Sequence, residues 1–257
     1  MINPCCIFTY HEDSNEAVLA ARAASMAGLF PVFVVEDLAK PISKDARQAL
    51  EEINAIVIAT EFPRPGNLRG IECISGMLQV FDRILRKTGA THLTKIDSDT
   101  ILTSGSSIRF AVQKDYRLFG WSSPEYDFHG STYVISKRHV EEMLGFINRW
   151  KGIPGLPNAS VPEDIGIFRM ALLMDSTELG VSAYDESGGF GSFWCFQPKT
   201  EFFPIYRKRF QSVSFGNRKD MDGKKVSRVE SYLAMSDFVN FLEKWPTRSS
   251  SDLQLAV

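Results

Sequence analysis

Short apolar runs alternate with helix-like segments along the first hundred residues, and this alternation limits what the chain can fold into more than any other feature. The apolar runs span 5–10, 31–35 and 55–59, and a further strand is expected at 93–96. Segments with apolar residues three and four positions apart lie between these strands at 16–27, 43–53 and 71–88. Strands that alternate with helices predict a parallel sheet whose crossover helices cover its faces. Asp13 and Glu16 have the spacing of a capping box at the start of the first helix. We therefore expect an α/β fold built on a central sheet.

The alternation loosens beyond residue 102. Two further strands are expected at 118–121 and 131–135 and three helices at 137–150, 163–174 and 236–245, whereas 188–217 shows little periodicity. This order favours a mixed sheet in the second half. Because 44% of the 257 residues are hydrophobic, the chain can form one large core. We expect a single domain over 1–246 and a flexible, Ser-rich tail at 247–257.

The charges are close to balanced, with 29 Lys and Arg against 31 Asp and Glu. A net charge of -2 gives no general attraction to nucleic acid, so no nucleic-acid partner is expected. No apolar run has the length of a membrane span, and the first residues lack a secretory leader. The four cysteines are not spaced as zinc ligands. These features favour a cytoplasmic protein with reduced thiols.

A basic cluster stands out between residues 207 and 228. It consists of Arg207, Lys208, Arg209, Arg218, Lys219, Lys224, Lys225 and Arg228. Such a cluster can close over a diphosphate or contact an anionic membrane surface, so peripheral membrane contact through 207–228 is one expectation. The alternative is an ordinary solvated loop.

The tripeptide Asp97-Ser98-Asp99 directly follows the strand expected at 93–96. It is therefore expected at the carboxyl end of a sheet strand, where ligands bind in α/β folds. Two carboxylates one residue apart can share a divalent cation, and that cation can neutralise a diphosphate. Aspartate also ends strands and forms turns, so the spacing alone is a weak signal. Asp220-Met221-Asp222 has the same spacing without a preceding strand and is interpreted as a surface loop.

Three segments resemble one enzyme family. Lys95-Ile96-Asp97-Ser98-Asp99-Thr100 is similar to the carboxylate-rich strand end of nucleotide-sugar glycosyltransferases with the GT-A fold, particularly the galactosyltransferase and Fringe type. His129-Gly130-Ser131-Thr132-Tyr133-Val134-Ile135-Ser136 is similar to a later strand of that family. Val161-Pro162-Glu163-Asp164-Ile165-Gly166 resembles its Glu-Asp-Val segment. The segments occur in the family's order across the middle of the chain.

The resemblance implies a metal-assisted enzyme that uses a nucleoside diphosphate sugar. Asp99, with Asp97 directly or through water or ribose, would hold Mn²⁺ or Mg²⁺ against the diphosphate. Many GT-A enzymes add a late histidine as a further metal ligand, but the last histidine here is His139. Asn217 or Ser214, or water, would take that place, with weaker metal binding as the result.

The resemblance also implies a carboxylate base that removes the proton of the acceptor hydroxyl. The matching residue is Asp164, and Glu163 is the second candidate. Glu163 has another interpretation, because Ser160 and Glu163 have capping-box spacing and acids in a first helical turn favour the helix dipole. Both interpretations of Glu163 stay open from the sequence.

Nucleotide binding is assigned by the resemblance to the first half, 1–102, and acceptor binding to the second half, 103–246. Strand-end residues of the first half would hold the base, ribose and diphosphate. The candidates are Thr9, Tyr10, Glu12, Asp37, Asn67, Arg69, Lys95, Asp97 and Ser98. Asp37 suits a base N–H and Arg69 suits a phosphate. A helix cap and a solvated arginine are the respective alternatives.

The predicted function is therefore a hexosyltransferase that acts on a hydroxyl of a saccharide or glycoconjugate, with UDP as the expected nucleotide and inversion implied by the resemblance. Two alternatives stay open. Asp97-Ser98-Asp99-Thr100 also resembles the motif of haloacid-dehalogenase-type phosphatases, whose first aspartate is the nucleophile, although three strand-like runs precede it here. The missing late histidine also fits a nucleotide-sugar-binding protein without catalytic activity.

Overall fold

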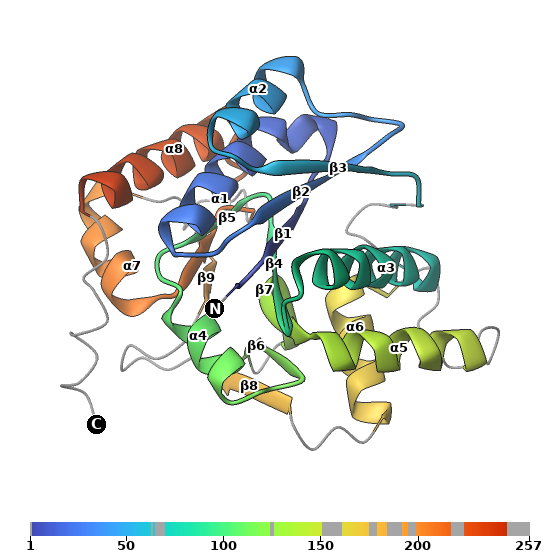
Figure 1. Ribbon diagram of the computed structural model, residues 1–257. Helices are drawn as coiled ribbons and strands as arrows, with labels where there is room; N and C mark the ends of the chain where they lie inside the picture. The colour runs from blue at the N-terminus through green and yellow to red at the C-terminus, as the bar shows by residue number, and fades with distance from the viewer. Residues whose placement is uncertain are drawn as a thin grey trace.

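The computed structural model describes residues 2–62, 64, 70–123, 126–150, 161–174, 179–183, 192–194, 199–216 and 224–245. Within this part of the chain the main sheet has seven strands in the order β3-β2-β1-β4-β7-β6-β8 (Figure 1). They are β1 (Cys5–Phe8), β2 (Val32–Asp37), β3 (Ile56–Thr60), β4 (His92–Asp97), β6 (Leu118–Ser123), β7 (Tyr126–Ser136) and β8 (Leu179–Ala183). The first four are mutually parallel, and β7 runs antiparallel to both β4 and β6. The predicted α/β class and mixed second half are confirmed.

Helices cover both faces of this sheet (Figure 1). One core includes α1 (Ser14–Met26), α2 (Lys44–Glu52) and α8 (Arg228–Lys244), and the other includes α3 (Ile71–Thr88), α5 (Lys137–Trp150) and α6 (Glu163–Leu173). In β1, Cys5 and Ile7 belong to the first core and Cys6 to the second, and all are fully buried. A strand that is buried on both faces needs an unbroken apolar run, which is the pattern in the sequence.

A second, small sheet follows the end of β4 and has no counterpart in the sequence prediction. Its described strands are β5 (Thr100–Leu102), β9 (Ser192–Trp194) and β10 (Ser212–Ser214), and β10 lies between the other two. The helices α4 (Ser106–Gln113) and α7 (Phe203–Arg209) are also absent from that prediction. Strands of three residues are too short for a period to be recognised. Their pairing brings the chain near residue 214 to the strand that follows Asp99.

Two helix starts differ from the prediction. α8 begins at Arg228 rather than at 236, because Ser227 and Glu230 form a capping box with N–H bonds of 3.2 and 2.9 Å. Asp13 does not cap α1 with its side chain, since a 3-10 turn, η1 (His11–Asp13), precedes that helix. The Asp13 carboxylate instead accepts a 2.6 Å bond from Arg228, which ties the start of α8 to the start of α1.

The described cysteines, Cys5, Cys6 and Cys73, are buried free thiols, as expected, and Cys195 lies outside the described residues. No helix in the described ranges is long and apolar enough to cross a membrane. The cytoplasmic location and the single domain over 1–246 stay predictions, and the tail at 247–257 lies outside the described residues.

Candidate functional site

The motif Asp97-Ser98-Asp99 lies at the carboxyl edge of the main sheet, where β4 ends and turns into β5. Asp97 pairs with Phe8, the last residue of β1, so the motif lies beside the end of a parallel neighbour. The Asp97 side chain is 37% exposed, Ser98 is buried and Asp99 is half-buried. The predicted position at a strand end is confirmed. Both carboxylates therefore lie at the edge where α/β folds bind ligands.

The chain near residue 215 passes very close to Asp99. The Phe215 N–H donates a 2.8 Å bond to the Asp99 carbonyl oxygen. A Cβ atom on Gly216 would meet the Asp99 carboxylate and displace it, so glycine leaves room for this carboxylate. The sequence prediction assigns a further metal ligand to this segment. Ser214 is buried in β10, and Asn217 lies outside the described residues.

Lys95, on β4, is the buried cation of the site. Its side chain is 1% exposed, and its ammonium pairs with Asp97 and with Glu163 Oε1 at 2.9 Å. It also donates a 2.6 Å bond to the Gly130 carbonyl oxygen and lies 5.5 Å from the ring centroid of Tyr133. Burial lowers the pKa of Lys95, but Asp97 and Glu163 raise it, and the net pKa is well above the ordinary value. The ammonium therefore stays charged inside the protein.

The start of α6 brings the two predicted catalytic acids to this lysine and to Gly130. Asp164 Oδ2 accepts a 2.8 Å bond from the Gly130 N–H, and Oδ1 accepts a 2.8 Å bond from the Ile165 N–H. A Cβ atom on Gly130 would lie 2.8 Å from Asp164, so this close approach requires glycine. Glu163 is 5% exposed, whereas Asp164 is half-buried. Of the two acids, Asp164 is the more accessible to a substrate.

Burial governs the protonation of both acids. It raises the pKa of Glu163 to about 7, with Lys95 lowering that pKa and Asp164 and Asp97 raising it. Burial also raises the pKa of Asp164, against backbone N–H bonds that favour the charged form. Pro162 is the N-cap of α6 and Glu163 is its first residue. The capping-box interpretation of Glu163 is therefore wrong, because that motif needs its glutamate two positions further into the helix.

The described nucleotide candidates outside the motif lie at the ends of β1 and β2. The Thr9 hydroxyl donates a 3.1 Å bond to the Tyr10 carbonyl oxygen, and the buried Tyr10 hydroxyl has no hydrogen-bond partner among the described residues. Asp37 Oδ1 accepts a 2.9 Å bond from the Ala39 N–H, which is the bond of a local turn. Glu12 is exposed. Two further candidates lie outside the described residues: Asn67 and Arg69.

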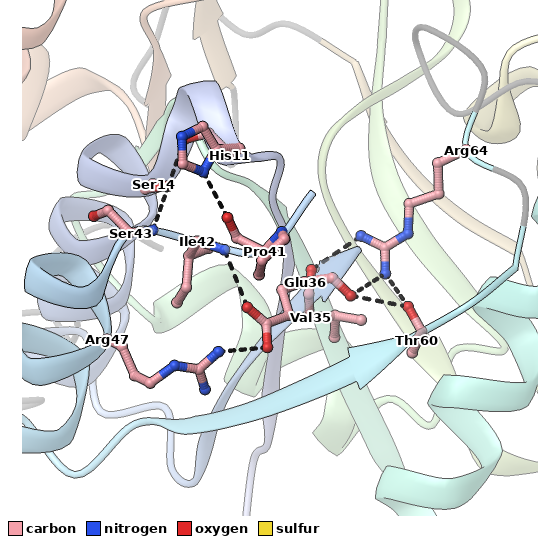
Figure 2. A network of polar contacts seen from close by, with 10 residues as sticks. All are labelled: His11, Ser14, Val35, Glu36, Pro41, Ile42, Ser43, Arg47, Thr60 and Arg64. Atoms are coloured by element: carbon pink, nitrogen blue, oxygen red, sulfur yellow. Dashed lines mark hydrogen bonds and ion pairs between the residues drawn. The ribbon is translucent and has the colours of Figure 1, made fainter. Parts of the chain in front are cut away.

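Glu36, which precedes Asp37 in β2, is a buried acid whose partners belong to the surrounding fold. It is 4% exposed, and its carboxylate pairs with Arg47 at 2.6 Å and accepts a 3.1 Å bond from the Ile42 N–H (Figure 2). A buried carboxylate with these partners has a structural role. Asp37 is thus the acid at the end of β2 that is nearer to solvent.

Arg64 is a further residue at this edge of the sheet, and it is absent from the residues predicted from the sequence. Its guanidinium donates to the carbonyl oxygens of Thr9, Val35 and Glu36 at 3.3, 3.1 and 2.9 Å and to the Thr60 hydroxyl. Figure 2 shows it reaching across the ends of β2 and β3. Its sequence signal is its place between two prolines after the third predicted strand. One side chain therefore holds several strand ends together beside the nucleotide candidates.

Replacement of Arg64 by alanine is expected to destabilise this edge. The guanidinium also lies 4.7 and 5.4 Å from the ring centroids of Phe62 and Phe8. Loss of the hydrogen bonds that Arg64 donates, together with the lost ring contacts, should lower the free energy of unfolding by about 1–3 kcal/mol. Urea unfolding measures this loss, with Arg83→Ala, a change at an exposed arginine of α3, as the control. Equal stabilities of the two variants would contradict the assigned role.

The motif has the chemistry of a site for Mg²⁺ or Mn²⁺. These ions prefer oxygen ligands, and Asp97 and Asp99 provide carboxylates at one strand end. In the described ranges no group of three or more His, Cys, Asp and Glu side chains is arranged to hold a metal. The two carboxylates fit an ion that takes its remaining ligands from a diphosphate and water.

The basic cluster is not one open cationic surface. Arg228 donates to the Glu12 carbonyl oxygen at 2.8 Å and to the Asp13 carboxylate at 2.6 Å. Lys208 and Arg209 are exposed at the end of α7, and part of the cluster lies outside the described residues. Nothing in the described part of the chain supports the predicted membrane contact through 207–228.

Solved structures resemble this chain, although no protein-family model and no curated protein matches it. The galactosyltransferase LgtC in complex with donor and acceptor sugar analogs is 13% identical over 96% of this chain and 98% of its own, with a TM-score of 0.51. A glycosyltransferase involved in glycosylation of the major capsid of PBCV-1 is 9% identical over 92% and 100%, with a TM-score of 0.55. GlyE from Streptococcus pneumoniae TIGR4 is 10% identical over 95% and 64%, with a TM-score of 0.52.

Such low identities carry information about the fold and not about the reaction. The similarity spans nearly the whole described chain, including both the parallel first half and the mixed second half of the sheet. The chain therefore has the GT-A fold of nucleotide-sugar glycosyltransferases, as its sequence motifs predict.

Proposed function

We propose that this chain is a glycosyltransferase that moves a sugar from a nucleoside diphosphate sugar to a hydroxyl group of a saccharide or glycoconjugate. The observation that carries the proposal is the meeting of acids from β4 and α6 at the carboxyl edge of the sheet. Asp97 and Glu163 pair with Lys95, and Asp164 binds the Gly130 backbone beside it. A hexose and UDP are the first candidates for the sugar and the nucleotide.

The donor end of the proposed site is the strand-end motif. Asp97 and Asp99 would hold Mn²⁺ or Mg²⁺, and Asn217 is a further candidate ligand. A cation bound there would neutralise the diphosphate and stabilise the departing nucleotide. Neighbouring strand ends supply the candidates for base, ribose and phosphate: Thr9, Tyr10, Glu12, Asp37, Asn67, Arg69 and Ser98.

Asp164 is the proposed general base. Its carboxylate is half-buried, and two backbone N–H groups fix its orientation. A carboxylate that is oriented and accessible can remove the acceptor proton as the new bond forms. Glu163 is the weaker candidate for this step, because it is buried against Lys95.

Inversion at the anomeric carbon belongs to the proposal through the family resemblance, and a single displacement assisted by the Asp164 base would produce it. The expected product therefore has the anomeric configuration opposite to that of the donor. NMR of the product, recorded before the anomers equilibrate, measures this directly. A product with the donor's configuration would rule out the single displacement while leaving the transferase activity intact.

Calorimetric titration of UDP, GDP and CMP, with and without Mn²⁺, tests the donor site. We expect UDP or GDP to bind, and the binding to require the metal, because the carboxylates alone repel a diphosphate. A screen of sugar nucleotides and acceptors on the same protein then tests transfer. No nucleotide binding under any condition would refute the proposed function.

Donor binding, transfer and adduct formation distinguish the transferase from a binding protein and from a phosphatase. Tight donor binding without transfer or hydrolysis would identify a binding protein. A phosphatase would form a fluoride-beryllium adduct at Asp97, but the motif follows the fourth strand of the sheet rather than the first. The matching folds are glycosyltransferases, so the phosphatase is the less favoured reading.

A further inference from the structure

A buried ion pair connects the donor end of the proposed site to the acceptor end. We propose that Glu163 is a positioning residue for the donor site: it shares the Lys95 ammonium with Asp97 and so keeps the Asp97 carboxylate available to a donor-bound metal ion. This inference rests on the proposed function, since it concerns the metal and nucleotide of the same site.

The surroundings of Lys95 support a shared charge. A lysine ammonium has three N–H donors, and in the described structure it lies among three oxygens, from Asp97 on β4, Gly130 on β7 and Glu163 on α6. The side chain is 1% exposed, so water contributes little to its solvation. Any change in one partner therefore alters the pairing with the others.

The two carboxylates are held differently. The ammonium donates hydrogen bonds to Asp97 and to the Gly130 carbonyl oxygen. Glu163 Oε1 lies 2.9 Å from the same nitrogen and is 5% exposed as a residue, whereas the Asp97 side chain is 37% exposed. Glu163 thus shares the charge of Lys95 from the buried side, and Asp97 keeps a face toward solvent.

The sign of the effect follows from competition between cations. Lys95 and a divalent metal both favour the Asp97 carboxylate, and charges in a buried site are weakly screened. Loss of the Glu163 charge leaves the ammonium with Asp97 as its one carboxylate partner. Metal binding at the motif should then weaken, although Glu163 lies on α6 and in the acceptor half of the chain.

The first test compares two neutralised acids. The Mn²⁺ concentration for half-maximal UDP binding is measured by calorimetry for the wild type, Glu163→Gln and Asp164→Asn. Asp164→Asn is the matched control: its carboxylate interacts with Lys95 through charge, but its hydrogen bonds come from backbone N–H groups, so the change removes no direct contact of the ammonium. We expect Glu163→Gln to raise this concentration about fivefold or more, and Asp164→Asn to change it less than about twofold.

Equal shifts in the two variants, or no shift in either, would overturn the inference, because the effect would not pass through Lys95. Absence of metal-dependent UDP or GDP binding in the wild type would instead overturn the proposed function. The two failures are therefore distinguishable in one experiment.

A second variant tests the role of Lys95 without leaving the buried Glu163 carboxylate uncompensated. Lys95→Met/Glu163→Gln removes both charges of the pair, so it should fold where Lys95→Met alone fails. With the competing ammonium gone, its Mn²⁺ requirement should be at least about fivefold below that of Glu163→Gln. A requirement equal to or above that of Glu163→Gln would contradict the competition between Lys95 and the metal. Thr94→Val changes the residue that precedes Lys95 in β4 and is also buried. It controls for disturbance of the strand and should leave the Mn²⁺ requirement unchanged.

Discussion

Asp99→Ala is expected to abolish metal-dependent nucleotide binding. Asp99 follows the carboxyl end of β4, and its carboxylate lies close to Gly216, where a Cβ atom would displace it. Without this carboxylate the motif retains one acid, Asp97, and that acid is already paired with Lys95. Loss of a principal charged ligand should weaken UDP binding in the presence of Mn²⁺ by about 100-fold or more. Calorimetry on the purified variant measures this loss.

The chain supplies its own control for this experiment. Asp222→Ala changes the second acid of Asp220-Met221-Asp222, which has the same spacing as the motif but no predicted strand before it. It should bind UDP and Mn²⁺ like the wild type. If Asp99→Ala binds as well as Asp222→Ala, the metal site does not lie at the end of β4, and the donor site must be sought elsewhere.

Asp164→Asn should remove most of the transferase activity while leaving the donor site intact. The change keeps the shape of the side chain but removes its capacity to accept a proton. We expect kcat to fall by about 10²- to 10⁴-fold, the usual contribution of a general base, with little change in UDP affinity. Burial raises the pKa of Asp164, and the base acts in its ionised form. In the wild type, kcat should therefore decline as the pH falls through a pKa above the ordinary aspartate value.

Two further variants distinguish the loss of the Asp164 base from a change in the helix dipole and from displacement of its carboxylate. Asp45→Asn removes an acid from the first turn of another helix, α2, and should leave kcat unchanged, which controls for the helix dipole. Gly130→Ala keeps the Asp164 carboxylate but places a methyl group 2.8 Å from it, so kcat should fall by displacement alone. Full activity of Asp164→Asn would eliminate this residue as the base.

Much of the fold was predictable because its physical signals are local. The unbroken apolar runs in β1 and β2 require burial on both faces, which in turn requires helices on both sides of a parallel sheet. The small sheet of β5, β9 and β10 carries no such signal. Strands of three residues become stable through pairing with distant segments, and no local pattern encodes that pairing: Ser212 of β10 pairs with Leu102 of β5 and with Ser192 of β9.

The candidate site shows the same division. Asp97, Asp99 and Asp164 were identified from their motifs, because strand ends and helix starts place acids at a known edge of the sheet. Arg64 was missed, because its partners are backbone carbonyl oxygens, which any residue has. The capping interpretation of Glu163 was wrong, because the structure makes Pro162 the N-cap and uses the glutamate as a partner of Lys95.

The α/β class, the resemblance to GT-A glycosyltransferases and the position of the acidic motif follow from the amino-acid sequence, because periodicity and strand-end residues are local signals. Three contacts follow from tertiary packing instead: Lys95 lies buried between Asp97 and Glu163, Gly130 binds both Lys95 and Asp164, and Gly216 adjoins Asp99. These contacts join β4, β7, α6 and the segment after β10. Burial and ion pairing depend on which distant segments meet, and that is settled by the packing of the whole chain.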